Sequence, residues 1–111
     1  MTSTNAQRHA WQLRNFKILE TLISRWSDLP VMIWTVSPFG ITGDPAAART
    51  DAEKEEAFGR WADLLGAVRS PRRESDGMTQ LSAFVKDYNE TGIGIVVRTT
   101  LYGDDESSVD Q

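Results

Sequence analysis

Apolar residues recur at steps of three and four between Arg8 and Trp26, the period of one face of an α-helix. The repeating positions are Phe16, Leu19, Leu22, Ile23 and Trp26, and the opposite side carries Arg14, Lys17, Thr21 and Arg25. The pattern predicts an amphipathic helix. We expect it to end before Leu29-Pro30, because proline restricts the residue before it to extended backbone.

Residues 31–36 have the composition of a β-strand, since they are mainly β-branched and aromatic. They are apolar at both odd and even positions, which predicts a strand covered on both faces and therefore central in a sheet. Proline and glycine at residues 37–40 favour a turn, and Ile41-Thr42 returns as a second short strand before Gly43. We expect a β-hairpin.

A second helix is predicted from Thr50 onward. Thr50 and Glu53 have the spacing of a capping box, in which each side chain accepts a hydrogen bond from the other residue's backbone amide. The apolar stripe of this helix consists of Ala57, Phe58, Trp61, Leu64 and Leu65. Gly66 stands where a left-handed residue ends many helices.

The last third of the chain predicts an exposed loop and a second hairpin. Residues 69–77 show no periodicity, whereas residues 80–86 alternate with Leu81, Ala83 and Val85 on one side. Residues 87–92 favour a hairpin loop. In the last strand the inward positions are Ile93, Ile95, Val97 and Leu101.

These elements predict an α+β fold with the order αββαββ. Both helices would pack on one face of a single antiparallel sheet, because a two-layer arrangement buries both stripes. Two separate sheets are the alternative. We expect one domain over residues 1–103, followed by an acidic flexible tail over residues 104–111.

Charge narrows the classes of partner. The net charge is −4, and four acidic residues lie in the last nine positions, so the rest of the chain is neutral. A neutral body lacks the broad positive field of proteins that bind nucleic acid without sequence preference. The chain has no cysteine, no export signal and no apolar run long enough to span a bilayer, which predicts a cytoplasmic protein without membrane contact.

Residues for catalysis are scarce. His9 is the only histidine, cysteine is absent, and Asp44, Asp76, Asp87 and Glu90 fall in predicted loops. Without a second imidazole or a thiol, neither a histidine metal site nor a nucleophile activated by a neighbouring base is readily assembled. We therefore expect no catalytic residue, metal or cofactor, and an enzyme is the weakest of three hypotheses.

Three apolar residues of the second hairpin are candidates for an interface. Phe84, Val96 and Tyr102 have the parity opposite to the buried positions of their strands. If helices cover only the other face, these residues favour a protein partner or a homodimer. The alternative is that they are scattered surface residues.

Arg69, Arg72 and Arg73 form the only basic cluster and are candidates for contact with an anion or a partner. Together with the basic face of the first helix they support a nucleic-acid-associated protein as the alternative function. Glu74 and Asp76 dilute this charge, so a solvated loop is the simpler interpretation.

The hydrophobic anchors resemble those of small uncharacterised proteins from actinobacteria and their phages. The similar segments are Leu29-Pro30 with Trp34-Thr35-Val36, Phe58-Gly59-Arg60-Trp61 with Leu64-Leu65, and Gly92-Ile93-Gly94-Ile95-Val96-Val97. The resemblance covers most of residues 16 to 102 and brings no known activity. It implies a genomic setting, and a phage origin would favour an accessory or host-modulating role. The first hypothesis is a non-enzymatic protein-interaction module.

Overall fold

A computed structural model describes residues 4–88 and 91–103 of the chain. These residues form two helices and six strands: α1 (Asn5–Arg25), β1 (Ile33–Ser37), β2 (Gly40–Asp44), α2 (Asp51–Leu65), β3 (Val68–Arg69), β4 (Arg73–Ser75), β5 (Met78–Val85) and β6 (Gly94–Leu101). All six strands belong to one sheet in the order β1-β2-β6-β5-β3, with β4 also paired to β5. The α+β class and the predicted αββαββ order are confirmed.

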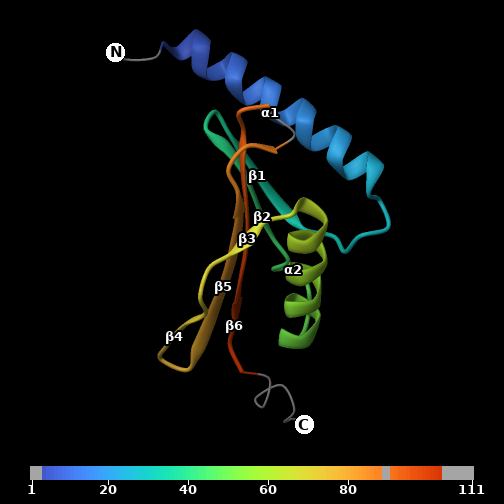
Figure 1. The fold of residues 1–111 in the computed structure, drawn as a ribbon, viewed down its shortest axis with the longest axis vertical. Coiled ribbons are helices and arrows are strands. Elements are labelled where there is room, and N and C mark those ends of the chain that lie inside the picture. Colours follow the sequence, from blue (N-terminus) through green and yellow to red (C-terminus); the bar gives the residue numbers. More distant parts are fainter. Residues whose placement is uncertain (1–3, 89–90, 104–111) are drawn as a thin grey trace.

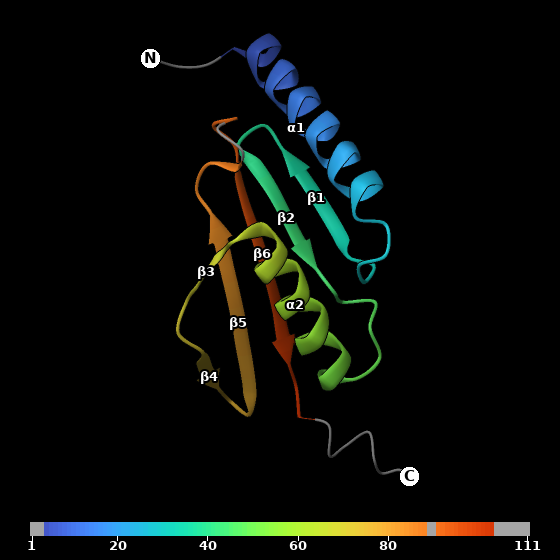
Figure 2. The same cartoon turned by 45° about the vertical axis from the view of Figure 1, so that its right-hand side comes forward.

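Both helices lie on the same face of the sheet, as Figure 1 shows with the sheet nearly edge-on. In Figure 2, α1 runs past β1 at one side of the sheet, and α2 crosses in front of β6 and β5. No described element covers the opposite face, which we call the open face. The hairpins therefore share one sheet, and the alternative of two separate sheets is wrong.

The helix ends follow from local hydrogen bonds. Thr4 and Gln7 form a capping box at the start of α1, and Thr50 and Glu53 form the predicted one at the start of α2. Gly66 ends α2 with a φ of 66°, the left-handed backbone that glycine adopts without steric penalty.

One pairing of the sheet differs from the prediction of antiparallel strands only. β2 and β6 run parallel, in a register that places Gly40 beside Gly94, so the sheet is mixed. The crossover through α2 brings the second hairpin back beside the first in this direction. A Cβ atom on Gly40 would lie 2.8 Å from the carbonyl oxygen of Gly94, so glycine is what permits the close approach.

The core lies between the helices and the inward positions of the sheet. Leu19 and Leu22 of α1 are buried, but Phe16 and Ile23 of the predicted stripe are exposed. Asn15 is buried instead, because its Nδ2 donates to the carbonyl oxygens of Ser37 and Pro38 in the β1–β2 turn. The carbonyl groups of the β1–β2 turn need a hydrogen-bond donor at this position of α1, where the helical periodicity alone suggests an apolar residue.

Two further predictions need correction. β1 lies at an edge of the sheet rather than in its centre, and Ile33 and Thr35 are exposed on its open face. Residues 69–77 are exposed as expected, but they are not an irregular loop throughout, because β3 and β4 pair with β5. Pairing with β5 fixes which way the side chains of β3 and β4 point.

Candidate interaction surface

Two residues of the predicted interface come together on the open face. Phe84 of β5 lies directly beside Val96 of β6, and Val68 of β3 flanks Phe84 on the other side. Val68 and Phe84 are exposed, and Val96 is half-buried. This row is one residue wide along the strands, so it forms a narrow apolar strip.

Tyr102 does not join that strip. Its ring lies over the Lys54 ammonium of α2, with Nζ 4.7 Å from the ring centroid. The backbone amides of Tyr102 and Gly103 donate to the carboxylate of Asp51. β6 ends at Leu101, so the strand alternation that predicted Tyr102 on the same face as Phe84 and Val96 does not extend to it.

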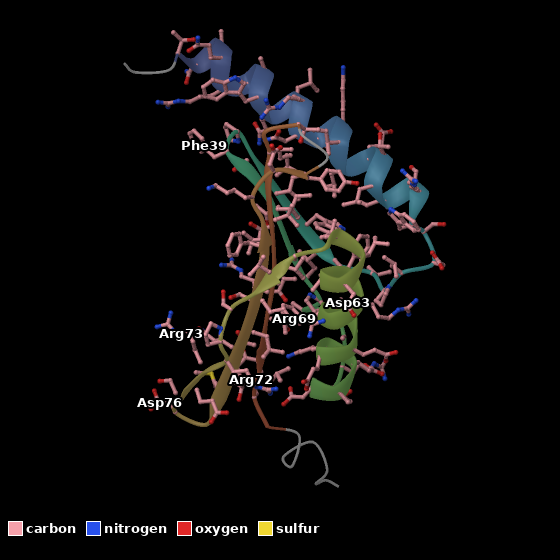
Figure 3. All side chains as sticks on the ribbon, in the orientation of Figure 1. Phe39, Asp63, Arg69, Arg72, Arg73 and Asp76 are labelled. Atoms are coloured by element: carbon pink, nitrogen blue, oxygen red, sulfur yellow. The ribbon has the colours of Figure 1, made fainter. Side chains whose placement is uncertain are left out.

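Arg69 and Arg72 turn toward α2. Arg69 Nη2 lies 2.7 Å from Asp63 Oδ1, and its guanidinium is 5.7 Å from the ring centroid of Phe58. Arg72 Nη1 lies 3.4 Å from Glu55 Oε2. Figure 3 shows the Arg69 and Asp63 side chains between β3 and α2. These two arginines connect the short β3–β4 segment to the helix layer.

Arg73 lies on the other side of the sheet, because it is paired with Gln80 on the open face. It lines a polar pocket of about 450 Å³ together with Arg98, Gln80, Ser82 and Thr100. Asp44 also contributes to this pocket. Within residues 4–88 and 91–103, neither Arg73 nor Arg98 has an ion-pair partner. The predicted arginine cluster is therefore divided between two faces.

The free edge of β1 is a feature that the sequence analysis missed. Val36 uses its carbonyl oxygen to accept a hydrogen bond from Gln12 Nε2 of α1 at 2.9 Å, so this carbonyl points away from β2. In an antiparallel strand the N–H and C=O of one residue point the same way, and residues two apart repeat that direction. Val36 and Trp34 therefore direct their backbone groups outward, and no described strand pairs with them.

α1 places apolar side chains beside this edge. His9, Gln12, Leu13 and Phe16 of α1 and Val36 of β1 line a hollow of about 430 Å³, which we call the α1–β1 groove. Leu13 and Phe16 are 54% and 53% exposed, although both are large and apolar. Most of the exposed large apolar residues of the described chain lie on α1, in the β1–β2 hairpin or just before β1. They are Leu13, Phe16, Ile23, Val31, Ile33 and Phe39.

β1 is held firmly on its inner side. The Trp34 ring meets the Trp61 ring edge to face, with centroids 5.1 Å apart. Trp61 Nε1 also donates to the carbonyl oxygen of Pro30 at 2.8 Å. Gly43 leaves room for Trp34, since a Cβ atom there would lie 2.5 Å from the indole ring. The edge is thus supported by packing with α2.

Two sequence signals could have indicated this edge. Leu13, Phe16 and Ile23 form a second apolar stripe on the first helix, separate from the buried Leu19 and Leu22. The strand from Ile33 to Ser37 also contains no charged residue and carries an apolar residue on its open face. The prediction assigned Phe16, Ile23 and the strand to the core, and it left Leu13 out.

No described group of three or more histidine, aspartate or glutamate side chains could hold a metal ion. In the described part of the chain, neither helix is long and apolar enough to cross a membrane. A scan against protein-family models, a search of curated proteins and a search of solved structures each found no match. The fold and its surfaces therefore carry the functional argument.

Proposed function

We propose that this protein is a non-enzymatic protein-interaction module that accepts an extended polypeptide segment at the free edge of β1. The observation that carries the proposal is the position of the edge. The outward backbone groups of Val36 lie in the groove with the half-exposed Leu13 and Phe16 of α1, and those of Trp34 continue the same edge. An added strand would gain backbone hydrogen bonds and an apolar cover together.

The chemistry of the partner segment follows from the two halves of the site. Its backbone pairs with Trp34 and Val36, which any extended sequence without proline at the pairing positions can do. Its side chains alternate between the two faces of the sheet, so every second residue faces the α1–β1 groove. Apolar residues at those positions would contact Leu13 and Phe16 and supply the specificity.

A displayed library of short random peptides tests this function. Peptides selected on the wild-type chain should share an apolar residue at every second position, and should lose at least about tenfold in affinity for Leu13→Glu or Phe16→Glu. Phe84→Ser is the matched control, because it removes an exposed apolar residue from the open face. Its affinity for the same peptides should be unchanged.

Two outcomes contradict the proposal. One is a selection that enriches no peptide. The other is a set of peptides that bind the two groove variants as well as the wild type, or that lose binding with Phe84→Ser. The last result would move the interface to the strip of Val68, Phe84 and Val96. Far-UV circular dichroism of each variant confirms that the fold is retained.

A second candidate function is supported by Arg73 and Arg98. Their guanidinium groups line one pocket with Gln80, Ser82 and Thr100, which favours an anionic ligand such as the backbone of a nucleic acid. Binding of a labelled single-stranded oligonucleotide at low salt should then fall in Arg73→Gln and Arg98→Gln and persist in Arg72→Gln, whose side chain pairs with Glu55. Absence of binding at low salt rejects this candidate.

The resemblance to actinobacterial and phage proteins remains a prediction. An accessory or host-modulating role agrees with a small interaction module whose partner is another polypeptide. Identification of the polypeptide that binds the β1 edge tests this role.

A further inference from the structure

The sequence of β1 lacks the features that keep edge strands apart. Natural edges carry lysine, proline, a bulge or an inward-pointing charge, or are covered by a helix or loop, and each of these prevents pairing with another chain. At β1 the contribution of α1 is the Gln12 side chain, which donates to the Val36 carbonyl oxygen. β1 reads Ile-Trp-Thr-Val-Ser, so it contains no charged residue and no proline between its ends. Its five residues pair in register with β2 from Ile33 to Ser37 without a bulge. The strand is therefore regular enough to act as a template on its outer side.

We infer that the segment that pairs with this edge is β1 of a second copy of the chain, antiparallel and centred on Thr35. The inference rests on the proposed function, because it names the occupant of the same edge. A two-fold axis through Thr35 overlaps the whole of both strands. It also sets Trp34 of each copy opposite Val36 of the other, and such pairs exchange both of their backbone hydrogen bonds.

The side chains of this pairing are mutually compatible. On the open face Thr35 would meet Thr35 of the second copy, and cross-strand threonine pairs stabilise sheets. On the helix face Trp34 would meet Val36 of the second copy, which pairs an aromatic with a β-branched residue. Since β1 has no charge, the two-fold pairing places no like charges opposite one another. A strand of this composition is complementary to itself.

α1 adds to the same contact. The axis stands perpendicular to the sheet, so the helices of both copies lie on one face of the joined sheet. The α1–β1 groove of each copy then receives the β1 side chains of the other, next to Leu13 and Phe16. Both copies use the same surface, as in the two-fold dimers that are commonest among soluble oligomers. The open face, with Arg73 and Arg98, stays uncovered in this dimer.

Gln12 is compatible with this arrangement. Its Nε2 now occupies one side of the Val36 carbonyl, where the N–H of an added strand would donate. A carbonyl oxygen has two lone pairs, so the side chain can share the acceptor or move away. The glutamine amide therefore takes the place of a strand donor while the edge is unpaired.

A pair of opposite charges at Thr35 tests the inference. Thr35 is exposed, so Thr35→Lys and Thr35→Glu should both fold with little change in stability. Each variant alone should be monomeric where the wild type is dimeric, with association at least about tenfold weaker, because like charges meet at the axis. An equimolar mixture of the two variants should form a heterodimer. Gln80→Lys, on the exposed face of β5, should dimerise as the wild type does.

Light scattering over a concentration series, with native mass spectrometry of the mixture, gives the readout. Dimers of the wild type and of the Lys–Glu mixture, with monomers of each variant alone, support the inference. A monomeric wild type at every concentration overturns it, and so does a dimer that neither Thr35 variant disrupts. The displayed-peptide selection separates failure of this inference from failure of the proposed function. If the chain is monomeric but still selects peptides that depend on Leu13 and Phe16, self-pairing is wrong and the proposed function stands.

Discussion

The two lateral edges of the sheet are built in opposite ways. The edge at β3 and β4 is made of short strands of two and three residues, and Arg69 and Arg72 tie this segment to α2. The edge at β1 is longer, uncharged and regular, and its outer backbone groups lie beside apolar side chains of α1. Short charged edges resist pairing, whereas long apolar edges invite it. By this principle the β3–β4 edge resists pairing, and the β1 edge is the one that the proposed function uses.

Removing the support of the β1 edge should have the largest effect. Trp61→Ala deletes the edge-to-face contact with Trp34 and the hydrogen bond to Pro30, and leaves a cavity in the core. We expect a loss of about 3–5 kcal/mol in the free energy of unfolding, measured by urea denaturation. Phe39→Ala, at an exposed turn residue, should change stability by less than about 0.5 kcal/mol. If the free energy of unfolding fell as little in Trp61→Ala as in Phe39→Ala, β1 would not be anchored through Trp61.

Disconnecting the β3–β4 edge should have a smaller effect. Arg69→Gln removes an ion pair with Asp63 and a contact with the Phe58 ring, and both arginine and aspartate are at least half exposed. Exposed pairs contribute little, so we expect a loss of about 1 kcal/mol in the free energy of unfolding. The loss should shrink at high salt. Arg73→Gln, on the open face, should leave stability within about 0.5 kcal/mol of the wild type. A larger loss in Arg73→Gln than in Arg69→Gln contradicts the assignment of the two arginines to different faces.

Of the three substitutions that alter an edge, Gln12→Ala should have the smallest effect on stability, and it sharpens the account of the β1 edge. The variant loses an exposed hydrogen bond to Val36, so the free energy of unfolding should fall by about 0.5 kcal/mol. Because the carbonyl is then free for an added strand, the affinity for selected peptides should rise or stay equal. Isothermal titration calorimetry measures this affinity. A fall of tenfold or more would mean that Gln12 is part of the binding site rather than a substitute for the missing strand.

Local signals made most of the fold predictable. The capping box at Thr50 and Glu53, the left-handed Gly66 and the alternation around Leu81 and Ala83 each depend on near neighbours in the sequence. These features fixed the helices and hairpins. The parallel pairing of β2 with β6 depends instead on the path of the crossover through α2, which no local pattern encodes.

The candidate site was less predictable, because apolar residues at its positions fit either a buried core or an exposed interaction surface. An apolar segment such as residues 31–36 is equally typical of a central strand and of an edge strand that can pair with another chain. The same ambiguity applies to Phe16, which the periodicity placed in the core and the structure places beside the β1 edge. The arginines were separated by the pairing of β4 with β5, and this depends on a register that the sequence alone did not reveal.

The most direct test of the β1 edge is amide hydrogen exchange followed by NMR over a range of protein concentrations. The account predicts that the outward amides of Trp34 and Val36 exchange more slowly as the concentration rises, because they become paired in the dimer. The amides of β3 should exchange at a constant rate. If the chain associates while the exchange of Trp34 and Val36 stays unchanged, the β1 edge is not the surface that the protein uses.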